Sequence, residues 1–460
     1  MEMKKPENQA GRKKNEDNKF SASLETLSGI MAPVKESVSI SGRGPAVKKE
    51  YVFWGVLAFL VIFCFVWFGE LIHLTVRNWK LRRHAAVYRA EMLKEYQGPI
   101  RIGVVAIKES AHDETYWNGI RFAVAEINET GGVMNRKIEL KEANDKGQAD
   151  IARKIAQEYA DDLTISAVIG HRFSDLTLST GMIYEYYGLL LICPKTTSPL
   201  LTSQGYKRVF RTNLSGTAYG IQMAEFAKKM GYKRIVVLYI DDAFGKGVAN
   251  AFEVRADALN LTIADRIPHN HSITDNEIEK RMSALHRNVE FDALVMVTVM
   301  KYGPDFIKLA RQAGIQKPLI LHEALDSENL IEQIGEKNCG EIYIASLYHP
   351  DYPFAKASSF AFRYEKQFGR IPNGLAAQSY DTVMILANAM ETAKSIIPDD
   401  IARTFREMDE WQGVTGPHKF TPEGDIIKPL QFKTIRDGHF TPYYISVEKP
   451  SDKNNATSHP

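Results

Sequence analysis

Short apolar strand segments alternate with helical segments through most of this chain, and the alternation restricts the folds open to it. The first series begins with the apolar run IRIGVVAI at residue 100 and ends near Thr212. A second series of the same kind runs from Ala218 to His322. Strands that alternate with helices imply parallel sheets joined by right-handed crossovers. The sequence therefore predicts an α/β fold with two lobes, each large enough to have its own core.

Two polar turns follow neighbouring strand segments within residues 170–202 of the first series. The first turn carries Ser174, and the second carries Thr196 and Thr197. The carboxyl ends of parallel strands meet at the edge where open α/β sheets bind ligands. These hydroxyls are therefore candidate ligand contacts. They can equally serve only as helix caps, and the residues alone leave both interpretations open.

The segments at the two ends of the chain differ in composition from the rest. Residues 1–50 and 448–460 are polar and poor in aromatic residues, which predicts disordered tails. Residues 51–76 begin with an uncharged stretch long enough to cover most of a hydrocarbon core of about 30 Å. We expect a retained transmembrane anchor there rather than a cleaved signal peptide. Residues 77–98 are predicted to form a basic helical stalk that can lie on lipid headgroups.

The basic residues around the predicted anchor leave its orientation open. Arginines and lysines close to the anchor are more frequent after it than before it, which places the large C-terminal part in the cytoplasm. The lysines and arginines of the whole N-terminal tail favour the opposite orientation. The charge pattern therefore does not decide between the two.

Several classes of function are disfavoured by the composition and by the motifs that are missing. A formal net charge of +2 argues against a nucleic-acid partner. The chain has no HExxH, CxxC or GxSxG motif, so we expect neither an enzyme nor a cofactor. His269 and His271 lack acidic or cysteine partners at metal-ligand spacing, and no metal is expected. Whether Cys193 and Cys339 pair is left open.

An ordered series of motifs covers residues 100–446 almost continuously. It consists of IRIGVVAI, WNGIRFAVAEINETGGVMNRKIEL, AVIGHRFSDLTL, LLLICPKTTSPLLTSQGYKRVFRT, VVLYIDDAFGKGVANAF, YGPDFIKLARQAG, AAQSYDTVMILANAM and WQGVTGPHKFTPEGD. This order resembles the type I periplasmic binding proteins of the leucine/isoleucine/valine class. Those proteins are the substrate-binding components of branched-chain amino acid ABC transporters.

The resemblance implies two Rossmann-like lobes with parallel sheets, joined by three crossovers, that close on a ligand like a Venus flytrap. It places residues 99–212 and 347–413 in lobe 1, and residues 213–346 and 414–447 in lobe 2. The implied crossovers fall near Arg211–Asn213, Ala345–Leu347 and Val414–His418.

The resemblance also implies where a ligand is held. Ser174 and Thr197 match positions that bind an α-carboxylate. The backbone carbonyl of Lys195 and the carboxylate of Glu323 match the acceptors of the α-ammonium group. Phe244 and Tyr302 match aromatic residues of the family's site. The sequence leaves open that Glu323 is a helix-capping surface acid and that the two aromatic residues only pack.

Lys195 departs from the family pattern, because this position usually holds a small residue. If its side chain points into the cleft, it favours a ligand with an additional anionic group. The candidates are an acidic or polar amino acid, or a carboxylate that is not an amino acid.

The expected function is that of a membrane-tethered solute-binding protein that captures an amino acid or a similar small carboxylate for an ABC permease. The expected location is the inner membrane, with a single span and the large domain in the periplasm or outside the cell. The alternative is a receptor ectodomain that senses the ligand and signals through the span.

Overall fold

The computed structural model describes residues 84–109 and 111–445. The predicted tails, 1–50 and 448–460, and the predicted anchor at residues 51–76 lie outside these residues. In the part of the chain that is described, no helix is long and apolar enough to cross a membrane.

Lobe 1 is built on a five-stranded parallel sheet in the order β2-β1-β3-β4-β5. Its strands are β1 (Ile100–Val105), β2 (Ile138–Ala143), β3 (Ile165–Gly170), β4 (Leu190–Cys193) and β5 (Val209–Arg211). Every residue of β3 and β4 is buried. Continuous apolar runs of this kind are typical of parallel strands that helices cover on both faces.

The helices of lobe 1 come from distant parts of the sequence. They are α4 (Ala111–Glu129), α5 (Ala149–Asp161), α6 (Ser174–Tyr186), α12 (Ala357–Phe368), α13 (Gly374–Ala393) and α14 (Pro398–Glu407). The long helix α13 packs against α4, where the rings of Phe122 and Tyr380 lie 5.8 Å apart. Phe360 of α12 joins the same aromatic cluster at 4.7 Å from Tyr380. The chain therefore returns to lobe 1 after it has built most of lobe 2.

Lobe 2 is built on a seven-stranded sheet in the order β15-β14-β10-β9-β8-β6-β7. Its strands are β6 (Arg234–Ile240), β7 (Thr262–His269), β8 (Ala293–Val297), β9 (Leu319–Leu321), β10 (Ile342–Ser346), β14 (Gln431–Arg436) and β15 (His439–Tyr443). Strands β6 to β10 pair in parallel, and β14 and β15 add an antiparallel edge. Asp437 and Gly438 both have positive φ, as the two-residue turn of this hairpin requires.

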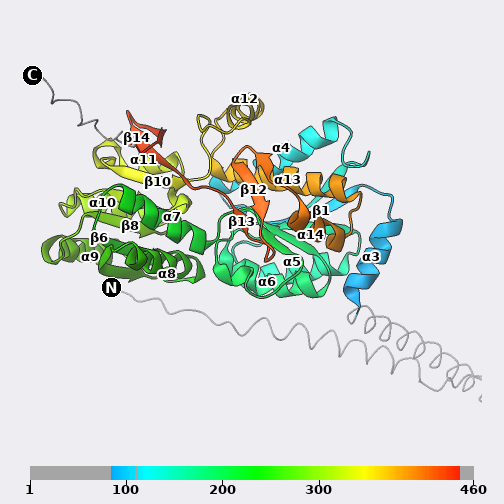
Figure 1. The fold of residues 1–460 in the computed structure, drawn as a ribbon, viewed down its shortest axis with the longest axis horizontal. Helices are drawn as coiled ribbons and strands as arrows, with labels where there is room; N and C mark the ends of the chain where they lie inside the picture. The colour runs from blue at the N-terminus through cyan, green and yellow to red at the C-terminus, as the bar shows by residue number, and fades with distance from the viewer. Residues whose placement is uncertain (1–83, 110, 446–460) are drawn as a thin grey trace, which may run out of the picture. The chain divides into compact units, whose positions relative to one another are not determined.

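The helices of lobe 2 cover its sheet. They are α7 (Gly216–Lys229), α8 (Ala243–Ala258), α9 (Asp275–Asn288), α10 (Gly303–Gln312) and α11 (Asn329–Ile334). Helix α7 packs on the antiparallel edge, where Phe226 stacks on Phe432 of β14 at 3.7 Å. Short 3-10 turns, η2 (Pro199–Leu201), η3 (Glu323–Leu325) and η4 (Glu336–Asn338), complete the loops. Figure 1 shows the two sheets in separate lobes with the chain passing between them.

The chain passes between the lobes three times, and the third passage lies later than the sequence indicates. The small antiparallel sheet of β11 (Trp411–Gly413), β12 (Gly416–Phe420) and β13 (Ile426–Ile427) belongs to lobe 1, not lobe 2. Phe420 packs at 4.6 Å from Phe405 of α14, and the Arg211 amide donates to the Gly424 carbonyl at 3.0 Å. The expected boundary at residue 414 is therefore corrected to residues 428–430.

The described part of the predicted stalk is a helix, α3 (Ala85–Glu95), that packs on lobe 1. Arg89 is fully buried, and its guanidinium donates to the carbonyls of Asp162, Ile165, Ala160 and Tyr187 at 2.6 to 3.1 Å. The expectation that the basic side chains of this segment face lipid is wrong for Arg89. Three carbonyls at the ends of α5 and α6 and the carbonyl of Ile165, the first residue of β3, bind it instead. The carbonyls at the helix ends have no partner within their own helices.

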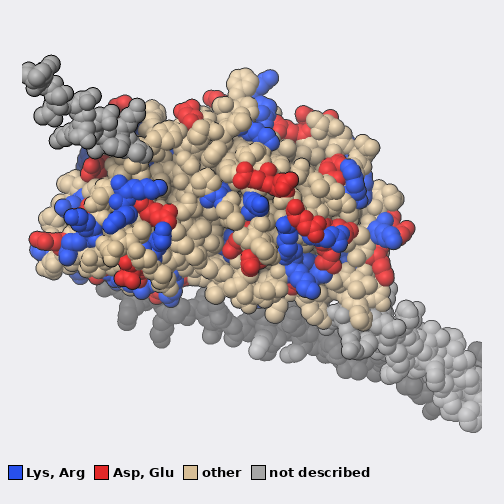
Figure 2. Space-filling model, in the orientation of Figure 1, with Lys and Arg blue, Asp and Glu red and all other residues tan. Residues whose placement is uncertain are grey.

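The remaining sequence predictions concern the cysteines and the surface. Cys193 is buried in β4 of lobe 1, Cys339 lies in lobe 2, and both are free thiols. The charge balance of the sequence argues against a concentrated basic face. On the face shown in Figure 2, acidic and basic side chains are interspersed and no single basic stripe is visible. Within residues 84–109 and 111–445, no three His, Cys, Asp or Glu side chains come together to hold a metal ion.

Candidate ligand-binding cleft

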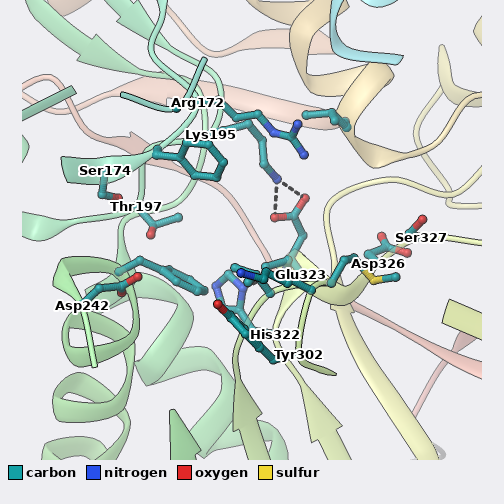
Figure 3. A pocket seen from close by; sticks show the side chains of 18 of the residues that line it. Arg172, Ser174, Lys195, Thr197, Asp242, Tyr302, His322, Glu323, Asp326 and Ser327 are labelled. Carbon is teal, nitrogen blue, oxygen red and sulfur yellow. Dashed lines mark hydrogen bonds and ion pairs between the residues drawn. The ribbon is translucent and has the colours of Figure 1, made fainter. Parts of the chain in front are cut away.

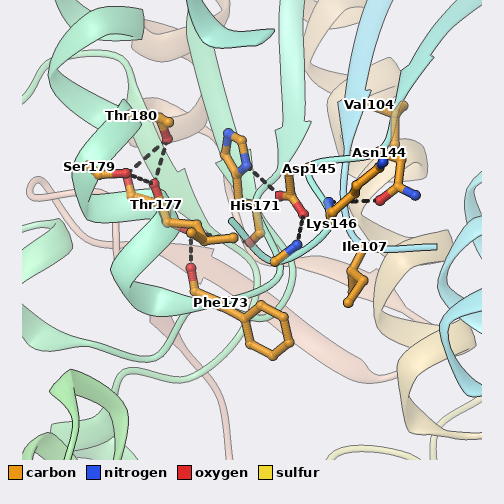
Figure 4. A network of polar contacts seen from close by, with 12 residues as sticks. Val104, Ile107, Asn144, Asp145, Lys146, His171, Phe173, Thr177, Ser179 and Thr180 are labelled. Carbon is orange, nitrogen blue, oxygen red and sulfur yellow. Dashed lines mark hydrogen bonds and ion pairs between the residues drawn. The ribbon is translucent and has the colours of Figure 1, made fainter. Parts of the chain in front are cut away.

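The turn after β3 is held in place by a buried polar network beneath it (Figure 4). His171 is fully buried, with Nδ1 at 2.8 Å from Asp145 and Nε2 at 3.1 Å from the Tyr184 hydroxyl. Gly170 has a φ of +148°, and a Cβ there would lie 2.3 Å from the Val105 carbonyl oxygen, so only glycine fits. The network therefore fixes the position of Ser174, which is the first residue of α6.

The turn after β4 lies beside the first turn. The Ser174 hydroxyl oxygen accepts a hydrogen bond from the Ser198 amide at 3.3 Å, which links the two turns. Thr197 is 3% exposed, and its hydroxyl has no hydrogen-bond partner among the described residues. Both Ser174 and Thr197 line the cavity between the lobes. The two turns therefore bring Ser174 and Thr197 to one cavity, and their role as ligand contacts stays a prediction.

Thr196 does not line the cavity, in contrast to the sequence prediction. Its hydroxyl lies 2.6 Å from that of Thr177 on α6 and 3.3 Å from the His171 carbonyl oxygen, and the residue is fully buried. Of the two adjacent threonines, only Thr197 lines the cavity.

Lobe 2 contributes residues that follow β6, β8 and β9. Asp242 caps α8 by accepting from the Gly245 amide at 2.8 Å, and Phe244 follows in the first turn of this helix. Tyr302 precedes α10, and its hydroxyl donates to the His271 carbonyl at 2.6 Å. Strand order reverses between β1 and β3 in lobe 1 and between β6 and β8 in lobe 2, the usual ligand site of open α/β sheets. Strands β3, β6 and β8 flank these points, and β4 and β9 each lie one strand further along their sheet.

The cavity between the lobes has a volume of about 710 Å³. Its wall combines apolar side chains with many polar and charged groups from both lobes. Figure 3 shows the lobe 1 residues facing those of lobe 2 across the cavity. The apolar part of the wall consists of Phe173, Leu176, Phe244, Val299, Met300, Tyr302 and Leu375.

An ion pair crosses the cavity between Lys195 and Glu323 (Figure 3). Lys195 Nζ lies 2.6 Å from each carboxylate oxygen of Glu323, and Gln378 Nε2 donates to Oε1 at 2.7 Å. Burial raises the pKa of Glu323, but the charge and hydrogen bond of Lys195, together with smaller contributions from His322 and Gln378, outweigh burial and lower the pKa overall. Glu323 is therefore an ionised acid within the cavity, and it is not a capping acid on the surface.

A second cation in the cavity wall, Arg172, was not singled out from the sequence. Its guanidinium pairs with Asp113 of α4, and burial lowers its pKa to about 10. The residue stands two positions before Ser174 in the same turn, which is the signal that could have identified it. Gln378 on α13 gave no such signal, because its approach to Glu323 depends on how the lobes pack.

His322 is a further wall residue that the sequence analysis did not identify. It is 1% exposed and lies between the rings of Tyr219, at 4.3 Å, and Phe244, at 4.9 Å. Burial lowers its pKa to about 3, so the ring is neutral near pH 7. Its Nδ1 accepts from the Ala324 amide at 3.0 Å, which leaves the proton on Nε2.

Comparison with known proteins agrees with this architecture. The sequence matches the family model of periplasmic binding proteins over residues 99–439. A leucine-, isoleucine-, valine-, threonine- and alanine-binding protein from Pseudomonas aeruginosa is 27% identical over 330 residues, 70% of this chain and 84% of that protein. Such relatives are binding proteins and not enzymes, as expected for this chain.

Two solved structures are similar in both sequence and fold. An ABC transporter substrate-binding protein from Desulfitobacterium hafniense, in complex with leucine, is 32% identical with a TM-score of 0.66. The similarity covers 75% of this chain and 100% of that one. A leucine-binding protein from Thermotoga maritima is 26% identical with a TM-score of 0.67, over 75% of this chain and 98% of that one. The chain therefore belongs to the periplasmic binding protein family, in its leucine/isoleucine/valine-binding class.

Proposed function

We propose that this protein is a membrane-tethered solute-binding protein that captures an amino acid or a related small carboxylate and delivers it to an ABC permease. The observation that carries the proposal is the cavity whose opposite walls come from different lobes. Hydroxyl donors at Ser174 and Thr197 belong to lobe 1, whereas Glu323 belongs to lobe 2. A ligand that touches both walls is bound fully only when the lobes are closed, so binding favours closure.

The ligand class follows from the donors and from the relatives. An unpaired hydroxyl and a helix N-terminus are suited to a carboxylate, which accepts hydrogen bonds only. The relatives named above bind leucine and other small amino acids. The apolar wall around Phe244 and Tyr302 offers space for a side chain beyond the carboxylate.

Isothermal titration calorimetry with the full-length chain in detergent tests this proposal. A panel of amino acids and small carboxylic acids should contain at least one ligand that binds with a micromolar or lower Kd. An absence of binding across the whole panel would contradict the proposal.

The membrane tether is supported by the uncharged stretch within residues 51–76. We expect the full-length protein to remain with the membrane fraction after a high-salt wash, and a variant without residues 51–76 to appear in the soluble fraction. Protease digestion of intact spheroplasts tests the orientation. Digestion of the large domain is expected for an extracytoplasmic cleft, whereas its protection would overturn that assignment.

A sensory role is the second candidate, and the docking of α3 favours it. Arg89 fixes α3 to lobe 1, and α3 is the described helix that lies nearest in sequence to the predicted span. A receptor needs such a connection to transmit closure, whereas a carrier does not. The two roles can be separated by deleting the gene for this protein: uptake of the ligand is lost if the protein is a carrier and unchanged if it is a sensor.

A further inference from the structure

Two buried donors of the cavity wall lack a partner among the described residues, whereas the buried carboxylate of Glu323 is already occupied. Ser174 accepts one hydrogen bond and keeps its own hydroxyl proton, and the Thr197 hydroxyl has no partner among the described residues. The protonated Nε2 of His322 is likewise without a partner in the described part of the chain. Buried donors of this kind are costly unless an acceptor meets them. The cavity is therefore suited to a group that accepts hydrogen bonds.

The two acceptors that the family resemblance assigns to an α-ammonium group are already used by the protein itself. Both oxygens of Glu323 face Lys195 Nζ at 2.6 Å, and one of them also accepts from Gln378. The backbone carbonyl of Lys195 accepts from Asn213 Nδ2 at 3.4 Å. The Lys195 ammonium thus occupies the place where an amino acid would put its own ammonium group.

Charge and burial both oppose replacement of Lys195 by a ligand ammonium. The side chains of Lys195 and Glu323 are only 14% and 4% exposed. A ligand ammonium would have to displace Lys195, which would then remain in the cleft as a buried cation without an acid partner. The other acids of the wall offer no buried replacement. Asp113 pairs with Arg172, and Asp326 pairs with Lys433 at 2.5 Å. Asp242 caps α8, and Asp175 is exposed to solvent.

We propose that the ligand is a small carboxylate that lacks an α-ammonium group, such as a 2-oxo acid with an apolar side chain. The inference rests on the proposed function, and it makes Lys195 the residue that determines specificity. The carboxylate binds to Ser174 and Thr197, and the side chain lies against the apolar wall near Phe244. Lys195 neutralises Glu323 and keeps a third N–H that can donate to the ligand.

Matched ligand pairs test the proposal with the full-length chain. The pairs are leucine with 4-methyl-2-oxopentanoate, phenylalanine with phenylpyruvate, and glutamate with 2-oxoglutarate. Calorimetry should show that, in at least one pair, the 2-oxo acid binds the wild-type protein at least about 100-fold more tightly than the amino acid, as loss of a buried ion pair would require. An amino acid that binds as tightly as its 2-oxo acid, or more tightly, overturns the proposal.

Substitution of Lys195 provides the second half of the test. Lys195→Ala frees Glu323, so the amino acid of the preferred pair should gain at least about tenfold in affinity while the 2-oxo acid loses affinity. Lys195→Met keeps most of the side-chain volume and carries the same expectation if the alanine variant does not fold. The control is Lys308→Ala, which removes a surface lysine paired with Asp305, and it should leave both affinities unchanged.

The possible failures can be told apart. An unchanged preference in both Lys195 variants overturns the role of Lys195. Tight binding of amino acids alone overturns the ligand class but leaves the proposed solute-binding function intact. If no pair binds and no other member of the wider acid panel binds, the proposed function fails together with this inference.

Discussion

Lys195 Nζ lies 2.6 Å from both carboxylate oxygens of Glu323, and the two residues belong to different lobes. Lys195 stands at the end of β4 in lobe 1, whereas Glu323 begins the turn η3 after β9 in lobe 2. The contact is made by the protein's own side chains. The ion pair therefore connects the two walls of the cavity. It also means that a ligand encounters a Glu323 carboxylate that is already neutralised by Lys195.

We expect the ion pair to stabilise the closed arrangement of the lobes. Glu323→Gln leaves Lys195 without its acid, and removing one member of a buried pair typically costs about 3–5 kcal/mol. The variant should therefore show a larger radius of gyration in small-angle X-ray scattering and a lower free energy of unfolding. The double variant Lys195→Met with Glu323→Gln should recover part of the loss, since no buried charge is left. Strictly additive losses would contradict the coupling.

The adjacent threonines give a matched pair of substitutions with opposite expected effects. Thr197→Val removes a hydroxyl that has no partner among the described residues, so stability should stay within about 0.5 kcal/mol. Ligand affinity should fall roughly tenfold, which corresponds to one lost hydrogen bond. Calorimetry and urea unfolding of the same samples measure both quantities.

Thr196→Val should show the reverse pattern. Its hydroxyl bonds to Thr177 and to the His171 carbonyl within the protein, so the loss should appear as about 1–2 kcal/mol of stability. Affinity measured well below the unfolding midpoint should change little. Loss of affinity in the Thr196 variant but not in the Thr197 variant would show that the two threonines have the opposite roles.

The placement of Ser174 and Thr197 could be predicted from the sequence because it depends on strand order and on local turns. Both follow buried strands that are neighbours in the sheet, and parallel strands end at the same edge. The partner of Lys195 could not be predicted in this way. Its contact with Glu323 spans 128 residues and depends on how the two lobes close.

The boundary errors also have a physical cause. Strands β11 and β13 contain only three and two residues, which is too few to show a hydrophobic period. The sequence pattern therefore could not identify these strands or place them in lobe 1. Arg89 was misassigned for a different reason. Within a basic segment an arginine looks solvent-exposed, and only the tertiary structure supplies the four carbonyls that bind it.

Arg89 should be important for the stability of lobe 1. Arg89→Ala leaves buried carbonyls at the ends of α5 and α6 without their donor, and we expect a loss of about 3–5 kcal/mol in the free energy of unfolding. The control is Arg101→Ala, since Arg101 is 37% exposed and its pair with Glu139 is 3.5 Å long. That exposed pair is screened by solvent, so its loss should have only a small effect on stability. Equal effects of the two substitutions in urea unfolding would contradict the anchoring role of Arg89.

Lys428 lies at the third passage between the lobes, and we expect its titration to make the free energy of unfolding depend on pH. Its Nζ donates to the Thr415 hydroxyl at 2.8 Å and lies 3.0 Å from His418 Nε2, and all three residues are buried. Burial lowers the pKa of Lys428 from 10.5 to about 7. Above pH 7 the folded protein has released a proton that the unfolded chain still binds.

The free energy of unfolding should therefore rise with pH from about pH 7 to pH 8.5, by up to about 1.4 kcal/mol per pH unit. Below pH 7 both states carry the proton, and Lys428 contributes no slope. Lys428→Met should remove the rise, whatever it does to the stability at pH 7. The exposed Lys419 on the same small sheet provides the control, and Lys419→Met should keep the wild-type slope. Urea unfolding at several pH values in this range measures the slope, and an equal slope in the Lys428 variant would assign the titration to another group.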